Sequence, residues 1–226
     1  MYTPPYFKLS NRGDMLDLIR RNSFGILLSP VGDRPEVTHI PFIVSSPGNM
    51  GSSAEEVQVS KAGQTVESAS TGGEGAELLF HVAAANPNPR PGKAMAIFQG
   101  PHAYISPSWY QEENTVPTWN YVAVHVRGEL ELIQDEEEIR NLMDTTIRQY
   151  EQSPSSWSMD WSNQTIKKML SGIRCFRMKI EELEGKAKLS QNHSKERRTK
   201  VIHKLSQGSE REREVARLMA QKMEQP

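Results

Sequence analysis

Alternating apolar and polar positions mark residues 118–133 as the longest extended segment of the chain. One parity is apolar and the other mostly polar: Val122, Val124, Val126, Leu130 and Leu132 against Tyr121, His125, Arg127, Glu129 and Glu131. A period of two over so many residues predicts a β-strand with one polar face. Gly128 stands where a bulge would bend that strand. A long bent strand of this kind is typical of a small closed barrel.

Shorter apolar runs predict further strands over 24–29, 37–44, 78–82, 94–99, 102–106 and 175–183. Pro41 lacks a backbone donor, so the strand over 37–44 is expected at a sheet edge or a bulge. Gly100-Pro101 is expected to form a turn between the strands over 94–99 and 102–106.

Helical periodicity predicts helices over 10–22, 135–152 and 163–173, and a short helical turn over 83–85 that Pro87 stops. The clearest is 135–152, where Asp135 and Glu138 have capping-box spacing. The tail over 210–223 is amphipathic, with Val215, Leu218 and Met219 aligned. It has no evident place in a barrel, so we expect an exposed or partner-bound helix.

These elements predict a mainly β protein with added helices (α+β), built on an antiparallel sheet. A doubly wound parallel sheet is disfavoured because its glycine-rich strand-to-helix turn is missing. Residues 45–77 hold seven Ser, six Gly and no aromatic residue, which predicts a disordered insertion. We therefore expect one domain over 1–192 that carries this insertion, followed by a basic and amphipathic helical tail over 193–226.

Composition narrows the classes of protein to consider. The 226 residues carry a formal net charge of -1, so non-specific nucleic-acid binding through net charge is not expected. A single cysteine, Cys175, excludes an internal disulfide framework and fits a reducing compartment. No apolar run is long enough for a membrane span, and the first residues lack the apolar core of a signal peptide. The six histidines show no helical metal-site spacing, so no metal is predicted, and a cytoplasmic or nuclear location is expected.

Two stretches, 100–110 and 116–121, concentrate side chains suited to a flat ligand. They bring Trp109, Tyr110, Trp119 and Tyr121 close to one turn, with neutral hydrogen-bonding groups from Ser106, Ser108, Thr118 and Asn120. Flat rings and short donors suit a planar heteroaromatic ligand. Ordinary barrel core beside a Ser-Pro turn is the alternative interpretation.

Basic residues dominate the segment over 186–204, whose local charge is +6. Lys186 and Lys188 share a face if the chain is extended there and, with Ser190, Gln191 and Asn192 following, could bind a phosphate. A solvated strand end would explain the same pair. The run formed by Lys195, Arg197, Arg198, Lys200 and Lys204 either contacts nucleic-acid phosphates or is a solvated helix face.

Six ordered segments of the chain resemble the PaiB family, described as FMN-binding negative transcriptional regulators. They are MYTPPYF at the start, THIPF at 38–42, HVAAANP at 81–87, IFQGPHAYISPSWY at 97–110, VPTWNY at 116–121 and LEGKAKLSQN at 183–192. The resemblance spans residues 1 to about 205 apart from the insertion. It implies an antiparallel split β-barrel of the pyridoxamine-phosphate-oxidase-like class, a homodimer with FMN in the crevice between chains, and a repressor role.

On this resemblance the cofactor-binding residues fall into three sets. Ser106, Ser108, Lys186 and Lys188 are expected at the phosphate; Trp109, Tyr110, Trp119 and Tyr121 at the ring; Thr118, Asn120 and Gln191 at the ring edge. His39 and His102 are further candidates, each of which a structural role would also explain.

Two departures from the family pattern affect these expectations. Ala84 stands where the family usually has Arg, which would place more of the phosphate contact on Lys186 and Lys188. The insertion and the tail are expected to be additions to the compact bacterial pattern. The resemblance also leaves open an FMN-dependent oxidoreductase or reductase without a direct role in transcription. No catalytic residue is assigned, and DNA remains a candidate partner.

Overall fold

The computed structural model describes residues 1–31, 34–45, 75–151 and 157–224. Most of the predicted insertion, 46–74, lies outside them. Along the chain the described elements are η1 (Pro5–Phe7), β1 (Lys8–Leu9), α1 (Arg12–Arg21), β2 (Phe24–Val31), β3 (Arg34–Pro41), β4 (Ile43–Ser45), β5 (Glu77–Ala83), β6 (Gly92–Ile105), η2 (Pro107–Trp109), β7 (Thr118–Ile133), α2 (Glu136–Tyr150), α3 (Gln164–Leu170), β8 (Ile173–Lys188), α4 (Lys195–Leu205) and α5 (Glu210–Glu224).

The strands form one sheet in the order β3-β2-β6-β7-β8-β5-β4, with β1 paired to β8. Antiparallel registers join β2 to β3, β4 to β5, β5 to β8 and β1 to β8. The predicted mainly β class with an antiparallel sheet is confirmed. β3 ends the strand order and Pro41 is its last residue, as the missing backbone donor led us to expect.

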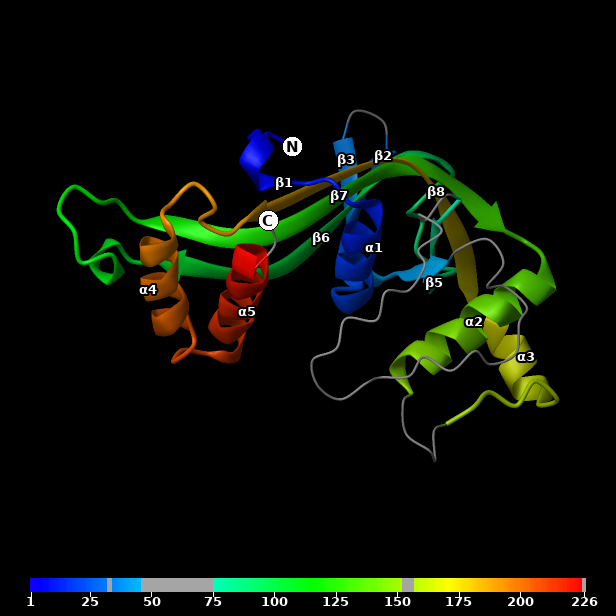
Figure 1. Cartoon of the computed structure of the whole chain (residues 1–226). Helices are drawn as coiled ribbons and strands as arrows, with labels where there is room; N and C mark the ends of the chain where they lie inside the picture. The colour runs from blue at the N-terminus through cyan, green and yellow to red at the C-terminus, as the bar shows by residue number, and fades with distance from the viewer. Residues whose placement is uncertain (32–33, 46–74, 152–156, 225–226) are drawn as a thin grey trace. The chain divides into compact units, whose positions relative to one another are not determined.

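The chain divides into two compact units (Figure 1). Unit 1 comprises Met1–Leu18, Ile97–His125 and Leu183–Pro226, and unit 2 comprises Ile19–Ala96 and Val126–Glu182. The long strands β6, β7 and β8 contribute residues to both units. The candidate residues divide accordingly, since His39 belongs to unit 2 and all the others belong to unit 1.

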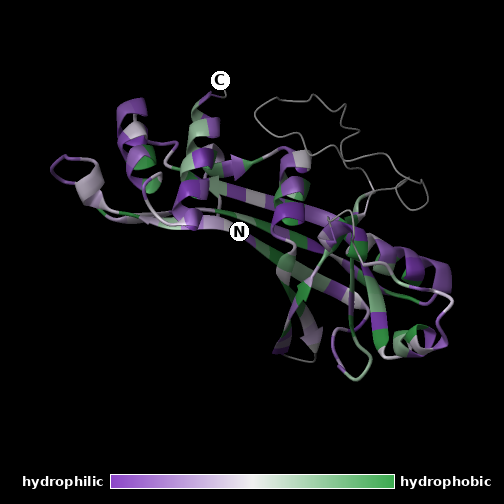
Figure 2. Ribbon diagram, turned by 90° about the horizontal axis from the view of Figure 1, so that it is seen from below, coloured by the Kyte–Doolittle hydropathy of each residue, from purple (hydrophilic) through white to green (hydrophobic). Residues whose placement is uncertain are grey.

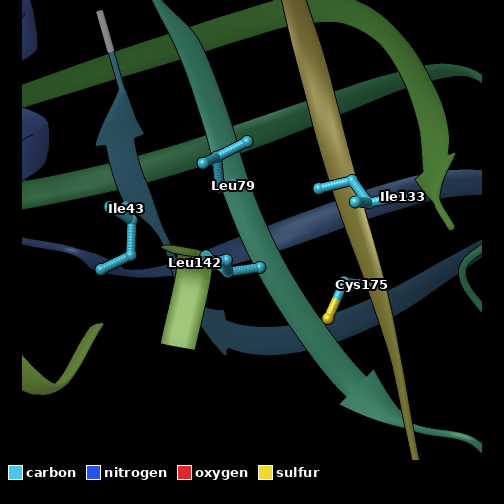
Figure 3. Close-up of a cluster of buried hydrophobic side chains, with 5 residues drawn as sticks. All are labelled: Ile43, Leu79, Ile133, Leu142 and Cys175. Atoms are coloured by element: carbon cyan, nitrogen blue, oxygen red, sulfur yellow. The ribbon is translucent and has the colours of Figure 1, made fainter. Parts of the chain in front are cut away.

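Unit 2 is held together by an apolar cluster of β4, β5, β7, α2 and β8. Figure 3 shows its five buried members, Ile43, Leu79, Ile133, Leu142 and Cys175. α2 is anchored at its start by Asp135, whose carboxylate accepts a hydrogen bond from the backbone N–H of Glu138 at 2.9 Å. The predicted cap of this helix is confirmed.

The two C-terminal helices α4 and α5 lie side by side and are part of the core of unit 1 (Figure 1). Val201 and Leu205 of α4 and Val215 and Met219 of α5 are buried. In Figure 2 the helix that ends at the C-terminus and its neighbour alternate hydrophilic and hydrophobic segments. The expectation of an exposed or partner-bound tail is therefore wrong for the apolar face of α5, because that face is already covered within unit 1.

Two further local expectations are corrected by the structure. β6 continues through Gly100-Pro101 as one strand, and Gly100 is buried where an added Cβ would meet Leu18 and Val122 at 3.4 Å. The predicted helix over 83–85 is a turn, closed by a hydrogen bond from the N–H of Asn86 to the carbonyl of Ala83 at 3.0 Å.

The alternation of β7 changes parity near its end. Leu132 is exposed and Ile133 is buried, because Ile133 faces the cluster of unit 2. Met169 of α3 is also exposed, although the helical period of 163–173 places it on the apolar face with Ile166 and Ile173. Gly128 is required by a close approach, since a Cβ there would lie 1.9 Å from the carbonyl oxygen of Lys179.

The predicted strand over 37–44 is two strands with different partners. β3 pairs with β2, whereas β4 pairs with β5, so Phe42 separates two pairings. Ser45 and Glu77, the ends of the predicted insertion, belong to β4 and β5. No described helix has the length and apolar character needed to cross a bilayer.

Candidate flavin-binding site

A cavity of about 360 Å³ opens in unit 1 where β7 begins, β8 ends and α4 starts. This volume lies in the range of small-molecule sites. Its walls are formed by Tyr110, Asn114, Thr115, Val116, Pro117, Thr118, Asn120, Lys188, Ser190, Asn192, His193 and Arg197. Four predicted residues, Tyr110, Thr118, Asn120 and Lys188, meet in it.

Unusual backbone geometry surrounds this cavity. All three non-glycine residues with positive φ in the described part of the chain lie on it or beside it: Gln111 (56°), Asn114 (59°) and Ser190 (63°). Left-handed backbone at a non-glycine residue costs free energy and tends to persist at ligand-binding sites. The clustering therefore marks the cavity as a candidate site independently of its side chains.

Tyr110 places a buried hydroxyl at the cavity wall. The residue is 2% exposed, and its hydroxyl has no hydrogen-bond partner of good geometry within the described residues. Burial raises the pKa of Tyr110, while Ser190 and Arg197 partly oppose that rise. The hydroxyl lies close enough to Ser190 to interact with it and still has capacity for a hydrogen bond to a ligand.

Arg197 and His193 frame the ring of Tyr110. The guanidinium of Arg197 lies 5.3 Å from the ring centroid, and the centroid of the His193 ring lies 5.4 Å from it. Arg197 Nε donates to both carboxylate oxygens of Glu112, at 3.0 and 2.9 Å, and its Nη2 contacts the same carboxylate. Arg197 Nη1 lies 3.3 Å from His193 Nδ1. Burial lowers the pKa of His193, and the nearby cations Arg197 and Lys188 lower it further.

Lys188 reaches the opposite wall from the end of β8. Its ammonium donates to the carbonyl of Trp119 at 2.7 Å and contacts the hydroxyl of Thr118. Burial lowers the pKa of Lys188, and the neighbouring Lys186 adds to the decrease. An ammonium has three donors, so these two oxygens leave one N–H for a ligand.

Asn120 and Ser190 join β7 to the turn after β8. The Asn120 amide nitrogen donates to the Ser190 hydroxyl at 3.0 Å, and that hydroxyl lies 3.1 Å from the amide oxygen. The same nitrogen lies 3.3 Å from the sulfur of Met219 on α5. Gln191 is committed to its own turn, since its amide accepts from the N–H of Leu189 at 2.6 Å. Asn120 therefore lines the cavity as part of its framework, and Gln191 does not line it.

An exposed aromatic group lies at the start of β7. Trp119 and Tyr104, 52% and 45% exposed, meet edge to face at a centroid distance of 6.0 Å, and His102 lies 6.1 Å from Trp119. We call these three residues the aromatic group. His102 Nε2 is 3.3 Å from Arg211 of α5. Lys188 connects this group to the cavity, because it lines the cavity and binds the carbonyl of Trp119.

Other predicted residues make contacts away from the cavity. Lys186 is buried, donates to the carbonyl of Tyr2 at 3.0 Å and lies 5.2 Å from the Tyr121 ring. The hydroxyls of Ser106 and Ser108 bond each other at 2.7 Å where η2 begins. Trp109 lies in η2 outside the cavity walls. In unit 2, His39 stacks on Phe24 at a centroid distance of 6.4 Å.

Sequence reasoning missed Asn114, Thr115 and His193 as site residues. It considered Ser190 and Asn192 beside the lysine pair as possible phosphate neighbours without selecting them, and it considered Arg197 only as part of the basic run. Arg197 belongs to a charge run whose pattern does not distinguish a cavity wall from a solvated face. Ala84 stands where the family usually has Arg, but an arginine from another strand lies near the same turn. Arg174 of β8 contacts the carbonyls of Asn86 and Pro89.

The fold is an antiparallel split barrel, and in unit 1 a polar, cationic cavity lies beside exposed aromatic rings. Residues 1–182 match the family described as "Putative FMN-binding domain". The chain belongs to this FMN-binding family and, within it, to the PaiB family, as the six sequence segments predicted. The predicted cofactor class, FMN, is confirmed at the level of the family.

Two relatives and one solved structure document the likeness. "Protease synthase and sporulation protein PAI 2" of Bacillus subtilis is 31% identical, covering 99% of this chain and 98% of its own. An uncharacterized protein of Emericella nidulans is 26% identical over 82% of both chains. A conserved hypothetical protein of Mycobacterium tuberculosis has the same fold with a TM-score of 0.52, at 12% identity, covering 86% of this chain and 96% of its own. The bacterial alignment includes the C-terminal tail, so the expectation that the tail is an addition to the bacterial pattern is wrong.

Proposed function

We propose that the protein binds FMN in unit 1, with the flavin ring against the aromatic group and the rest of the cofactor extending toward the cavity. The observation that carries the proposal is the link through Lys188, which joins the exposed Trp119 to a cationic cavity. Trp119 offers a flat π-face in solvent, which suits a planar heteroaromatic ring. Trp109 and Tyr121 remain proposed ring contacts, and Ser106, Ser108, Lys186, Gln191 and His39 remain untested candidates.

We further propose that the working form is a homodimer. Tyr2, Tyr104 and Trp119, three large aromatic side chains of unit 1, are 87%, 45% and 52% exposed. Exposed aromatic residues are enriched at surfaces that pair with another molecule. A second copy of this chain would cover them and close one side of the flavin site.

Titration with FMN tests the binding proposal. Loss of ring stacking is worth roughly 0.5–1.5 kcal/mol, so Trp119→Ala is expected to weaken FMN binding about 2- to 12-fold. Trp157→Ala is the matched control, because Trp157 is 56% exposed in unit 2 and outside both the aromatic group and the cavity. A wild-type protein that is colourless as purified and shows no micromolar quenching of added FMN would contradict the proposal. Light scattering tests the dimer, and a monomer in the presence of FMN would contradict it.

The biological role we propose is negative regulation of transcription, which the resemblance to the PaiB family implies; the related Bacillus subtilis protein is named "Protease synthase and sporulation protein PAI 2". Two residues of the basic run are already engaged within the chain, which counts against direct DNA contact through them. Arg197 pairs with Glu112, and Lys200 pairs with Glu196 at 3.3 Å and donates to the Tyr110 carbonyl. Gel shifts over a salt series test DNA binding. Anaerobic reduction of the bound flavin by NAD(P)H without any DNA affinity would favour the oxidoreductase alternative.

A further inference from the structure

We propose that a second cavity, located in unit 2, binds an amphipathic monocarboxylate, which is a small acid with one carboxylate on an apolar body. This unit 2 cavity has a volume of about 570 Å³, within the range of small-molecule sites. All of its lining residues belong to unit 2, whereas the cavity described above belongs to unit 1. The proposal therefore does not depend on flavin binding.

The unit 2 cavity lies across five neighbouring strands of the sheet. β3, β2, β6, β7 and β8 follow one another in the strand order, and each contributes lining residues. Neighbours in this order are joined by backbone hydrogen bonds. A site built on paired strands has its shape before a ligand arrives, so binding costs little conformational freedom.

Five apolar side chains give the unit 2 cavity its affinity for an apolar body. Leu28, Ala94 and Met95 are half-buried. Pro30 and Pro35, which are opposite each other in the register of β2 and β3, are exposed. Covering apolar surface that is in contact with water is favourable. The apolar part of a ligand would provide that cover.

Four charged side chains also line the unit 2 cavity, and three of them are already paired. Lys93 pairs with Glu181, which is itself a lining residue, and with Glu129 at 3.4 Å. Arg127 pairs with Glu182 at 3.1 Å. The charges of these three lining residues are therefore balanced within unit 2.

Arg34 is the charged lining residue whose charge is not balanced. It is exposed at the start of β3, and its side chain makes no ion pair within the described part of the chain. A guanidinium presents a planar fork of donors that matches the two oxygens of a carboxylate. One unbalanced cation beside apolar side chains favours a ligand with a single negative charge. A phosphate monoester or a dicarboxylate would bring a second charge without a matching cation.

The lining of the unit 2 cavity favours binding over catalysis. Its described residues include no histidine, cysteine or tyrosine. The lining hydroxyl belongs to Ser29, which is 2% exposed, and the lining carboxylate of Glu181 is paired with Lys93. A nucleophile or general base must reach the reacting atoms of its substrate. The acid is therefore expected to be bound and released unchanged.

The decisive measurement compares octanoate with octan-1-ol, which has the same chain length and no charge. In isothermal titration calorimetry, wild-type protein is expected to bind octanoate at least tenfold more tightly than octan-1-ol. Arg34→Gln is expected to lower octanoate affinity at least tenfold and to change octan-1-ol affinity less than twofold. Arg148→Gln is the matched control, since Arg148 lies exposed on α2, donates to the Thr145 hydroxyl at 3.2 Å and does not line the cavity. Equal affinity for octanoate and octan-1-ol would overturn the proposal.

NMR of the methionine methyl groups locates the bound acid. The Met95 signal, assigned with Met95→Leu, is expected to shift on titration of wild-type protein with octanoate. The Met169 signal is expected to stay unchanged, because Met169 is 69% exposed in unit 2 but lies outside the cavity. Equal shifts of the two signals would indicate unspecific binding to exposed apolar groups and would overturn the proposal. Absence of a Met95 shift at millimolar octanoate would also overturn it.

A second copy of this chain is the alternative occupant of the unit 2 cavity. A Met95 signal that changes on dilution of the protein and does not respond to octanoate would identify that occupant and overturn the proposal. The flavin site is tested separately, because the two cavities share no lining residue. Charge-dependent octanoate binding by a protein that does not bind FMN would refute the proposed function and support the unit 2 site.

Discussion

Asn120 and Ser190 line the cavity of unit 1 and are also buried, so substitutions of either residue should change the stability of the protein. Asn120 is 0% exposed and Ser190 is 3% exposed, and their side chains meet at 3.0 and 3.1 Å. Asn120→Ala removes both contacts and leaves a buried hydroxyl unsatisfied, which costs about 1–3 kcal/mol. The lost packing against Met219 adds to this, so we expect the free energy of unfolding to fall by about 2–4 kcal/mol.

Ser190→Gly should behave differently, because two effects oppose each other. The substitution leaves the Asn120 amide without its partner, at about 1–3 kcal/mol. It also relieves a residue whose φ is 63°, where glycine is favoured by roughly 1 kcal/mol or more. The net loss is therefore expected to be about 0–2 kcal/mol, smaller than for Asn120→Ala.

Urea denaturation of the two single variants and the double variant measures the coupling. Either single substitution already removes the hydrogen bonds between Asn120 and Ser190, so the second substitution cannot remove them again. The free energy of unfolding of the double variant should therefore exceed the value expected from the sum of the two single losses by about 1–2 kcal/mol. Additivity within about 0.5 kcal/mol would refute the reasoning. A changed denaturant slope would indicate altered two-state behaviour, and the comparison would then need hydrogen exchange at the same residues.

Four other predictions follow from the geometry. Gly128→Ala should lower the free energy of unfolding by about 3 kcal/mol or more, since its Cβ would lie 1.9 Å from the Lys179 carbonyl oxygen. Gly100→Ala, whose Cβ would have its nearest atoms at 3.4 Å, should change the free energy of unfolding by less than about 1 kcal/mol. Equal losses for the two variants would contradict this prediction. Leu142→Ala should cost about 2–5 kcal/mol by urea denaturation, because its side chain is 1% exposed in the unit 2 cluster; a loss below 1 kcal/mol would contradict that packing. Burial raises the pKa of Cys175 to about 11, so a thiol reagent at pH 8 should modify it only after unfolding, and rapid labelling of native protein would oppose this. FMN binding should be accompanied by protonation of His193, which faces Tyr110, Lys188, Arg197 and Glu112. Calorimetry in two buffers should detect this proton uptake, and His193→Gln should abolish it. Proton uptake that survives the substitution would contradict the assignment of the proton to His193.

The pKa of His193 determines in which direction FMN affinity should change with pH. In the free protein this pKa lies below its usual 6.5, because of burial and nearby cations, and a bound dianion would raise it. The contribution of His193 to FMN affinity is therefore full below the free-state pKa and is lost as pH rises through the higher pKa of the complex.

Local patterns were sufficient for several elements. The parity of 118–133 predicted the bounds of β7, and the spacing of Asp135 and Glu138 predicted the start of α2. Both depend on interactions between near neighbours in the chain, which the sequence displays directly. The same holds for α1, whose apolar face repeats with helical period.

Long-range packing decided what these patterns left open. Gly100-Pro101 is typical of a turn, yet β6 passes through it, because the neighbouring strands continue on and Gly100 fits against Val122. The apolar face of α5 is visible in the sequence, but its cover within unit 1 is not. Leu132 and Ile133 exchange the expected exposure because the cluster of unit 2 lies on the side of Ile133.

The candidate site divides in the same way. Its rings and its lysine could be read from residue types and short spacings, and the family segments indicated the cofactor. The cavity itself joins four stretches: the end of η2, the start of β7, the end of β8 and the start of α4. Arg197 differs from its basic neighbours only because Glu112, eighty-five positions earlier, and Tyr110 meet it in the folded chain. Such convergence depends on distances between remote residues, which side-chain chemistry along the chain does not encode in any local pattern.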